Sequence, residues 1–193
     1  MIYHEFKELK LSSLGFGTMR LPLIPGGGEQ DIDQETLDRM VDCAIAGGVN
    51  YFDTAYPYHG GCSELAIGKS LARYPRESFY LADKFPGHQI VKGVKKLDPE
   101  TIFEEQLRKC GVEYFDFYLL HNINEHSMSY YGNPENKYLD YFLEQKANGR
   151  IKHLGFSCHS AAEGLEQFLQ MCGDKMEFCQ IQLCLLYTSD AAD

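Results

Sequence analysis

Four polar side chains that can move a proton stand at or just after the ends of predicted strands. Asp53 follows the segment VNYF, Tyr58 lies five residues further on, and Lys84 and His121 end two later apolar segments. A cation beside a phenol favours the phenolate and lowers its pKa, which would make Tyr58 next to Lys84 a usable proton donor. Asp53 would orient Lys84 and hold it charged, and a neutral His121 would donate a hydrogen bond to a substrate carbonyl. The set predicts proton transfer to a small carbonyl substrate.

This set contains no nucleophile and no evident group of metal ligands. The group that adds to the carbonyl carbon must then come from a cofactor, and a hydride is the natural choice. Each of the four residues alone is more often structural, as a packed loop tyrosine or a hydrogen-bonded core histidine. Their joint placement at successive strand ends is what favours a catalytic interpretation.

The elements that must position these residues alternate between strand and helix. After a hairpin over residues 3–11, strands are expected over residues 14–18, 49–53, 79–84, 115–121, 151–157 and 178–183. Helical periodicity fills the intervals, with Ser63 and Ser160 as expected N-caps and Asp98-Pro99 opening the helix that Gly111 ends. Strands that alternate with helices require a parallel sheet with helical crossovers.

Two architectures satisfy that pattern, an open doubly wound sheet and a (β/α)8 TIM barrel. The open sheet should carry a GxGxxG turn that opens a helix after its first strand. Residues 15–20 read GFGTMR, which lack the third glycine and open no helix. The sequence therefore predicts a barrel, incomplete because only about six of the eight strand–helix units are present.

The composition and net charge of the chain limit the classes of partner that it can bind. The 193 residues carry a formal net charge of −10, which argues against nucleic-acid and anionic-membrane partners because both need clustered Lys and Arg. The charged N-terminal segment MIYHEFKELK and the lack of a long apolar run predict a cytoplasmic location. The seven cysteines form no CxxC pair, so reduced and mostly buried thiols are expected. The sequence gives no indication of oligomeric state.

Five segments of the chain form an ordered set of motifs: LGFGTMRLP at 14–22, YFDTAYPYHGGCSE at 51–64, FYLADKF at 79–85, YFDFYLLH at 114–121 and GRIKHLGFSCHS at 149–160. In these segments the chain resembles the aldo-keto reductases, in particular a bacterial branch whose longer members can carry an iron–sulfur segment. The resemblance implies a (β/α)8 barrel that reduces aldehydes or ketones with NADPH. It makes Tyr58 the proton donor and Asp53, Lys84 and His121 the rest of the catalytic tetrad.

The same resemblance implies a set of cofactor contacts. Gly17, Thr18 and Met19 would lie against the cofactor, and Ser157 and Gln180 would bind the nicotinamide carboxamide. Many members have an asparagine after that serine, whereas this chain has Cys158, so His159 becomes the candidate substitute. A redox or metal role for Cys158 is an alternative, although a metal site needs several matched ligands.

The resemblance covers about the N-terminal two-thirds of the family's length. We therefore predict a partial barrel over residues 1–183 and a non-native tail over residues 184–193, CLLYTSDAAD. On that reading the chain is an inactive fragment of a longer reductase that binds NADPH poorly. The alternatives are a barrel that senses cofactor without turnover, a truncated remnant, and a metal-dependent barrel hydrolase. The hydrolase would need an HxH pair after the first strand, where this chain has GTMR.

Overall fold

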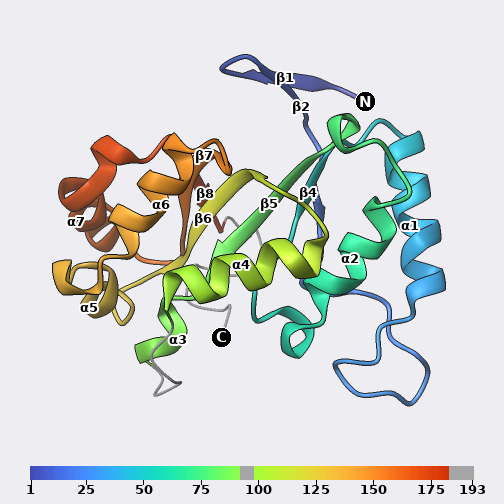
Figure 1. Cartoon of the computed structure of the whole chain (residues 1–193), viewed down its shortest axis with the longest axis horizontal. Helices are drawn as coiled ribbons and strands as arrows, with labels where there is room; N and C mark the ends of the chain where they lie inside the picture. The colour runs from blue at the N-terminus through green and yellow to red at the C-terminus, as the bar shows by residue number, and fades with distance from the viewer. Residues whose placement is uncertain (92–97, 183–193) are drawn as a thin grey trace. The chain divides into compact units, whose positions relative to one another are not determined.

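A computed structural model of the chain describes residues 1–91 and 98–182 (Figure 1). Within those residues the strands are β1 (Tyr3–Phe6), β2 (Leu9–Ser12), β3 (Phe16–Gly17), β4 (Tyr51–Asp53), β5 (Tyr80–Phe85), β6 (Phe115–Ile123), β7 (Ile151–Cys158) and β8 (Cys179–Ile181). The α-helices are α1 (Gln34–Ala46), α2 (Ser63–Leu71), α3 (His88–Val91), α4 (Pro99–Cys110), α5 (Met128–Tyr131), α6 (Tyr138–Ala147) and α7 (Ala162–Cys172). Short 3-10 helices are η1 (Tyr58–Gly61), η2 (Arg76–Ser78), η3 (Pro134–Asn136) and η4 (Gly173–Lys175).

The strands follow the chain order expected of a barrel. β1 and β2 form an antiparallel hairpin, and β3 to β8 form a separate sheet in the order β3-β4-β5-β6-β7-β8. The pairs β3–β4, β4–β5 and β7–β8 are parallel. A doubly wound sheet reverses its strand order at a switch point, and this sheet has no reversal among the described strands. The predicted barrel topology and N-terminal hairpin are therefore confirmed.

The chain divides into two compact units, each with its own core. The first comprises Met1–Asp83 with Glu104–Asp116, and the second comprises Lys84–Phe103 with Phe117–Asp193. In the first unit α1 and α2 lie side by side (Figure 1). Leu37 and Val41 of α1 and Ile67 of α2 are fully buried, which removes these apolar side chains from water.

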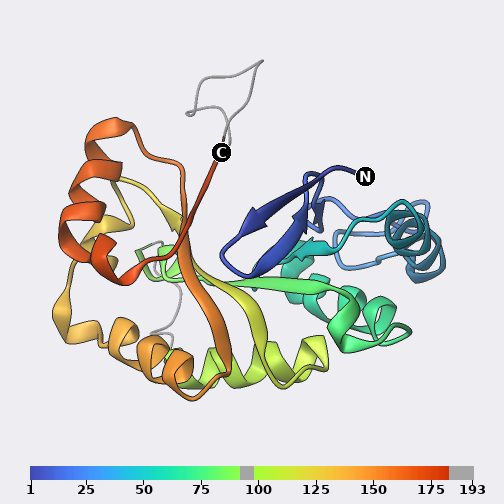
Figure 2. The same ribbon diagram turned by 90° about the horizontal axis from the view of Figure 1, so that it is seen from above.

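The core of the second unit is aromatic. β6 and β7 run side by side, and α6 packs against β7 (Figure 2). Phe142 of α6 is fully buried, with its ring centroid 5.1 Å from that of Phe85 and 4.9 Å from that of Tyr118. Phe156 of β7 packs on Phe168 of α7 at 4.6 Å. These ring contacts fix the strands that carry two of the predicted site residues.

Two predicted helix caps are wrong and one is confirmed. Ser63 is the first residue of α2 rather than its cap, and Ala161 rather than Ser160 precedes α7. Asp98 caps α4 as predicted, because its carboxylate accepts from the Thr101 backbone N–H at 2.9 Å. The short helices α3 and α5 were not predicted. Residue 183, at the end of the predicted last strand, and the predicted tail 184–193 lie outside the described residues.

Across residues 1–91 and 98–182, no helix has both the length and the apolar character needed to cross a membrane.

Candidate active site

The first unit places Asp53 beside the residues expected to meet the cofactor. Asp53 ends β4, where it stands opposite Gly17 of β3 and is 9% exposed. The Asp53 carbonyl accepts from the backbone N–H of Thr18 at 2.9 Å and from its hydroxyl at 3.0 Å. Thr18 is fully buried and Met19 is exposed, while nothing lies within 4 Å of a Cβ built on Gly17. Open space therefore remains over the end of β3, next to Asp53.

Three hydroxyl groups connect the strand ends of the first unit to the start of α2. The Ser63 hydroxyl donates to Thr18 Oγ1 at 2.7 Å and lies 3.0 Å from Thr54 Oγ1. All three residues are fully buried. Ser63 thus uses its side chain to hold the ends of β3 and β4, which is why it does not cap its own helix.

Tyr58 begins the turn η1, directly before α2. It is half-buried, and its backbone N–H donates to the Ala55 carbonyl at 3.1 Å. The next residues, His59, Gly60 and Gly61, have φ values of 54°, 58° and 89°. This left-handed stretch reverses the chain tightly after the phenol.

The second unit brings Lys84 and His121 together. Lys84 of β5 is 2% exposed and His121 of β6 is 7% exposed. Burial, followed by the electrostatic effects of Lys84, His88 and His159, lowers the pKa of His121 well below its usual value. The imidazole is therefore neutral at neutral pH, the form that can donate a hydrogen bond to a carbonyl without giving up a proton.

Two further histidines lie near His121: His88, which the sequence reasoning missed, and His159, which it named only as a substitute cofactor contact. The His88 ring of α3 meets the His121 ring edge-on, with centroids 4.7 Å apart. His159 follows β7, and its backbone N–H donates to the Ile123 carbonyl at 2.9 Å. The motif FPGH after β5 could have signalled His88, because chemistry at a barrel gathers just beyond the strand ends.

Ser157 of β7 and Gln180 of β8, the predicted carboxamide contacts, are partners in the register of these two parallel strands. The Ser157 hydroxyl accepts from the Asn122 backbone N–H at 2.8 Å, so it is anchored next to His121. Cys158 is 3% exposed. By strand alternation it shares a face with Phe156, which packs on α7.

Tyr131 braces the strands that carry Lys84 and His121. Its hydroxyl donates to the carbonyls of His121 at 2.9 Å and Phe85 at 3.2 Å. Its ring lies so close to Gly87 that a Cβ there would come within 2.6 Å of Tyr131 Cζ. Burial raises the pKa of Tyr131 well above its usual value, so this hydroxyl stays protonated and keeps donating.

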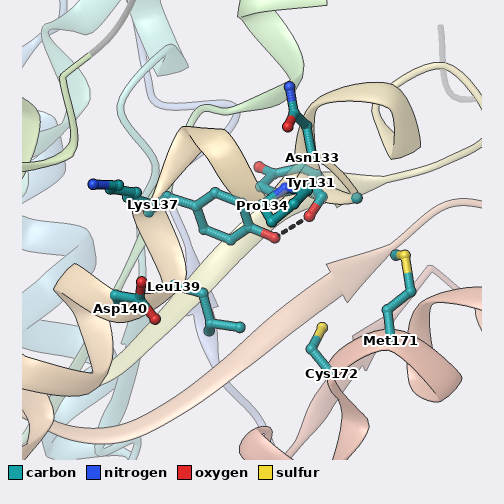
Figure 3. Close-up of a pocket in the computed structure, with 10 residues that line it drawn as sticks. Tyr131, Asn133, Pro134, Lys137, Leu139, Asp140, Met171 and Cys172 are labelled. Carbon is teal, nitrogen blue, oxygen red and sulfur yellow. Dashed lines mark hydrogen bonds between the residues drawn. The ribbon is translucent and has the colours of Figure 1, made fainter.

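Tyr131 also lines a cavity of about 380 Å³ (Figure 3). It is lined from α5, η3, α6 and the end of α7, with Tyr138, Leu139 and Met171 among its walls. The Tyr138 hydroxyl donates to the Tyr131 carbonyl. The predicted catalytic residues do not line this cavity, and Tyr131 is its link to their strands.

The four predicted catalytic residues thus fall into two pairs, each within its own unit. Asp53 and Tyr58 follow β4 in the first unit, and Lys84 and His121 share the second. The complete tetrad remains a prediction. Within the described residues, no group of three or more His, Cys, Asp or Glu side chains is arranged to hold a metal ion.

This chain belongs to the aldo/keto reductase family, whose sequence model matches residues 13–192. It is 28% identical to an NADH-specific methylglyoxal reductase of Escherichia coli over 180 residues, 84% of this chain and 53% of that protein. It is 26% identical over 110 residues to an aldehyde reductase of Saccharomyces cerevisiae, 56% of this chain and 29% of that protein. The chain spans about half the length of several curated relatives that it matches.

Solved structures agree on the fold. A thermostable aldo-keto reductase, Tm1743, crystallised with the inhibitor epalrestat, superimposes with a TM-score of 0.72 at 26% identity, over 95% of this chain and 63% of that one. The holo form of the aldo-keto reductase AKR11C1 from Bacillus halodurans gives 0.71 at 24% identity, over 95% of this chain and 58% of that one. The chain is therefore an incomplete (β/α)8 barrel of the aldo/keto reductase family, a family of oxidoreductases.

Proposed function

We propose that this chain carries the catalytic part of an NADPH-dependent reductase that converts aldehydes or ketones to alcohols. Tyr58 donates the proton to the carbonyl oxygen, Lys84 and Asp53 favour that transfer, and His121 orients the carbonyl. The observation that carries the proposal is the buried pair of an ammonium and a neutral imidazole on β5 and β6. Burying two basic side chains together costs free energy, which favours a functional reason for the pair.

Several residues fit a nicotinamide cofactor. Gly17 leaves open space beside Asp53, and Ser157 and Gln180 stand opposite each other with the serine hydroxyl anchored. When bound, a reduced nicotinamide supplies the hydride that adds to the carbonyl carbon. Ser157 and Gln180 would hold the carboxamide, and Gly17, Thr18 and Met19 would lie along the cofactor.

The proton path follows from the residues of this chain. As the carbonyl oxygen gains charge, the phenol of Tyr58 gives up its proton to it. A neutral His121 donates its own hydrogen bond to the same oxygen and fixes the direction of the lone pair that Tyr58 protonates. The charge of Lys84 would stabilise the resulting phenolate.

The test is consumption of NADPH and of NADH in the presence of methylglyoxal and of a simple aliphatic aldehyde. NADH is included because the Escherichia coli relative is, by its name, NADH-specific. The assay is run on this 193-residue chain and on the product of the complete reading frame of its gene. We expect turnover from the complete product and little from this chain. Turnover by this chain alone would contradict the prediction that it is an inactive fragment.

A second candidate is a barrel that senses cofactor without turnover. It predicts tight binding of a nicotinamide cofactor and no reduction of any carbonyl by the complete gene product. The presence of all four tetrad residues in the sequence favours the reductase.

A further inference from the structure

The turn after Tyr58 has an unusual backbone at His59. This residue has φ 54° and ψ 43°, a left-handed conformation that residues other than glycine seldom adopt. Gly60 and Gly61 continue the left-handed path. Something outside the turn must therefore hold His59 in place, because the local backbone preference does not.

Both ring nitrogens of His59 bind the backbone of the segment between β3 and α1. The Leu21 N–H donates to His59 Nε2 at 2.9 Å, and His59 Nδ1 lies 2.9 Å from the Glu29 carbonyl oxygen. An amide N–H can only donate and a carbonyl can only accept. Nε2 must therefore be bare and Nδ1 must carry the proton, which fixes one neutral tautomer.

A third contact joins the same two segments. The Gln30 side-chain amide donates to the Gly60 carbonyl at 3.2 Å. His59 is 7% exposed, so the two hydrogen bonds of its ring are shielded from competing water. Residues 21–30 are thereby held against the turn that begins with Tyr58.

The clamped segment starts directly after the residues expected to meet the cofactor. Thr18 is bonded to Asp53, and Leu21, three residues later, is bonded to His59. A shift of the turn would therefore be transmitted to the strand end at Thr18, and a shift of the segment would move Tyr58. The two ring hydrogen bonds of His59, together with the Gln30 contact, couple the turn and the segment.

We propose that His59 is a positioning residue, which locks the Tyr58 turn and the 21–30 segment into one body so that the phenol is held at a fixed place relative to the β3 end. The ring moves no proton in the reaction. This inference rests on the proposed function only where it concerns catalysis, since the lock itself is a property of the first unit.

The lock is tested first without any turnover, by nitrogen NMR of the His59 ring and by hydrogen exchange in the purified protein. We expect the Nδ1–H tautomer, a protected Leu21 amide, and a protected Cys62 amide, which donates to the His59 carbonyl within the turn. In His59→Gly, which tolerates the left-handed backbone but has no ring, both amides should exchange faster together. The Nε2–H tautomer, or faster exchange at only one of the two amides, would overturn the proposal.

Two further variants separate the two ring contacts. His59→Asn suits a left-handed backbone and offers an amide near the Nδ1 position, whereas His59→Gln reaches the Nε2 position with its carbonyl oxygen. Gln should restore protection of the Leu21 amide more than Asn does. These variants also keep the test open if His59→Gly unfolds.

Kinetics of the complete gene product then test the catalytic consequence. His59→Gly should lower kcat by about tenfold to a hundredfold, the effect of a displacement of roughly 1 Å at a reacting group, and Gln should recover part of it. A merely structural histidine would lower the melting temperature and leave kcat of the folded enzyme unchanged. If Tyr58→Phe keeps full turnover, the proposed function fails while the NMR result on His59 still stands.

Discussion

The two units hold their site residues by different means. In the first unit, Asp53 and Tyr58 stand at a strand end and in a turn, where side-chain hydrogen bonds from Thr18 and His59 to the backbone fix the chain. In the second, Lys84 and His121 lie inside strands packed against aromatic rings. A hydrogen bond fixes the orientation of a group through one local contact. Packing holds a residue in position only while the whole core around it is intact. Mutations at the site in the first unit should therefore lower activity with little loss of stability, whereas mutations in the second unit should lower both.

The sharpest test of the first unit is Tyr58→Phe. Removing the proton donor should lower kcat by about 10²- to 10⁴-fold, the usual contribution of general acid catalysis, and should leave cofactor binding and melting temperature nearly unchanged. Steady-state kinetics and cofactor titration of the complete gene product give both values. Tyr56→Phe is the matched control, since the Tyr56 hydroxyl instead donates to Glu105. A similar loss in both variants would remove the special role of Tyr58.

In the second unit the corresponding test is Phe142→Ala. The ring is fully buried against Phe85 and Tyr118, so its loss should lower the free energy of unfolding by about 3–5 kcal/mol. Chemical denaturation measures the change. Leu169→Ala on α7 serves as control, because Leu169 is 43% exposed and should cost no more than about 0.5 kcal/mol. Equal effects from the two changes would show that packing does not hold this unit.

The first unit also contains ion pairs, among them the pair of Glu64 and Lys109. Their charged atoms are 2.9 Å apart, with Glu64 fully buried and Lys109 15% exposed. Burial raises the pKa of Glu64, and Lys109 opposes that rise. Lys109→Met should destabilise the fold by up to about 3 kcal/mol, the low end for a broken buried pair because the lysine is partly solvated.

The loss of stability in Lys109→Met should depend on pH, and the raised pKa of Glu64 sets the direction of that dependence. A carboxyl whose folded-state pKa is raised contributes stability that is present below its unfolded pKa and lost as pH rises through the folded pKa. The Met variant should therefore lose more stability at about pH 8 than at about pH 5, as followed by denaturation at each pH. A loss independent of pH would mean that Glu64 is not the group left uncompensated.

The smallest expected effect concerns His121. Because its folded-state pKa is lowered, the unfolded chain binds a proton that the folded chain refuses, so stability falls as pH drops through the unfolded value near ~6.5. His121→Asn should reduce the slope of stability against pH between about 7 and 5 by up to about 1.4 kcal/mol per pH unit. Unchanged slopes would contradict a neutral, buried imidazole.

The sequence predicted the sheet well because its strands are short apolar runs between strong breakers. The run before Asp53 and the run that ends at His121 both form strands of the expected sheet. β6 continues to Ile123 because residues 122 and 123 still pair and pack. The caps of Ser63 and Ser160 were wrong, since each hydroxyl has a different partner: Thr18 for Ser63, and the Ala161 carbonyl for Ser160. A cap depends on one residue's hydrogen bond, and tertiary contacts decide it.

The sequence predicted which residues should belong to the site, but not the contacts that hold them in place. Nothing in the segment YHGG indicates that His59 binds Leu21 and Glu29, because those contacts join residues 38 and 30 positions apart. The proximity of His88 to His121 likewise depends on the four-residue helix α3, which has too few residues for periodicity to reveal it. Spacing along the chain identifies candidates, and only the fold identifies what holds them.

The contact of Gly87 with Tyr131 has a consequence for how related sequences can diverge. A side chain at position 87 would displace the ring, and with it the hydroxyl that binds the His121 and Phe85 carbonyls. The residues at positions 87 and 131 should therefore change together in evolution. A homologue with alanine or serine at position 87 should carry a smaller residue at 131, and a single exchange at either position should be selected against although neither residue performs chemistry.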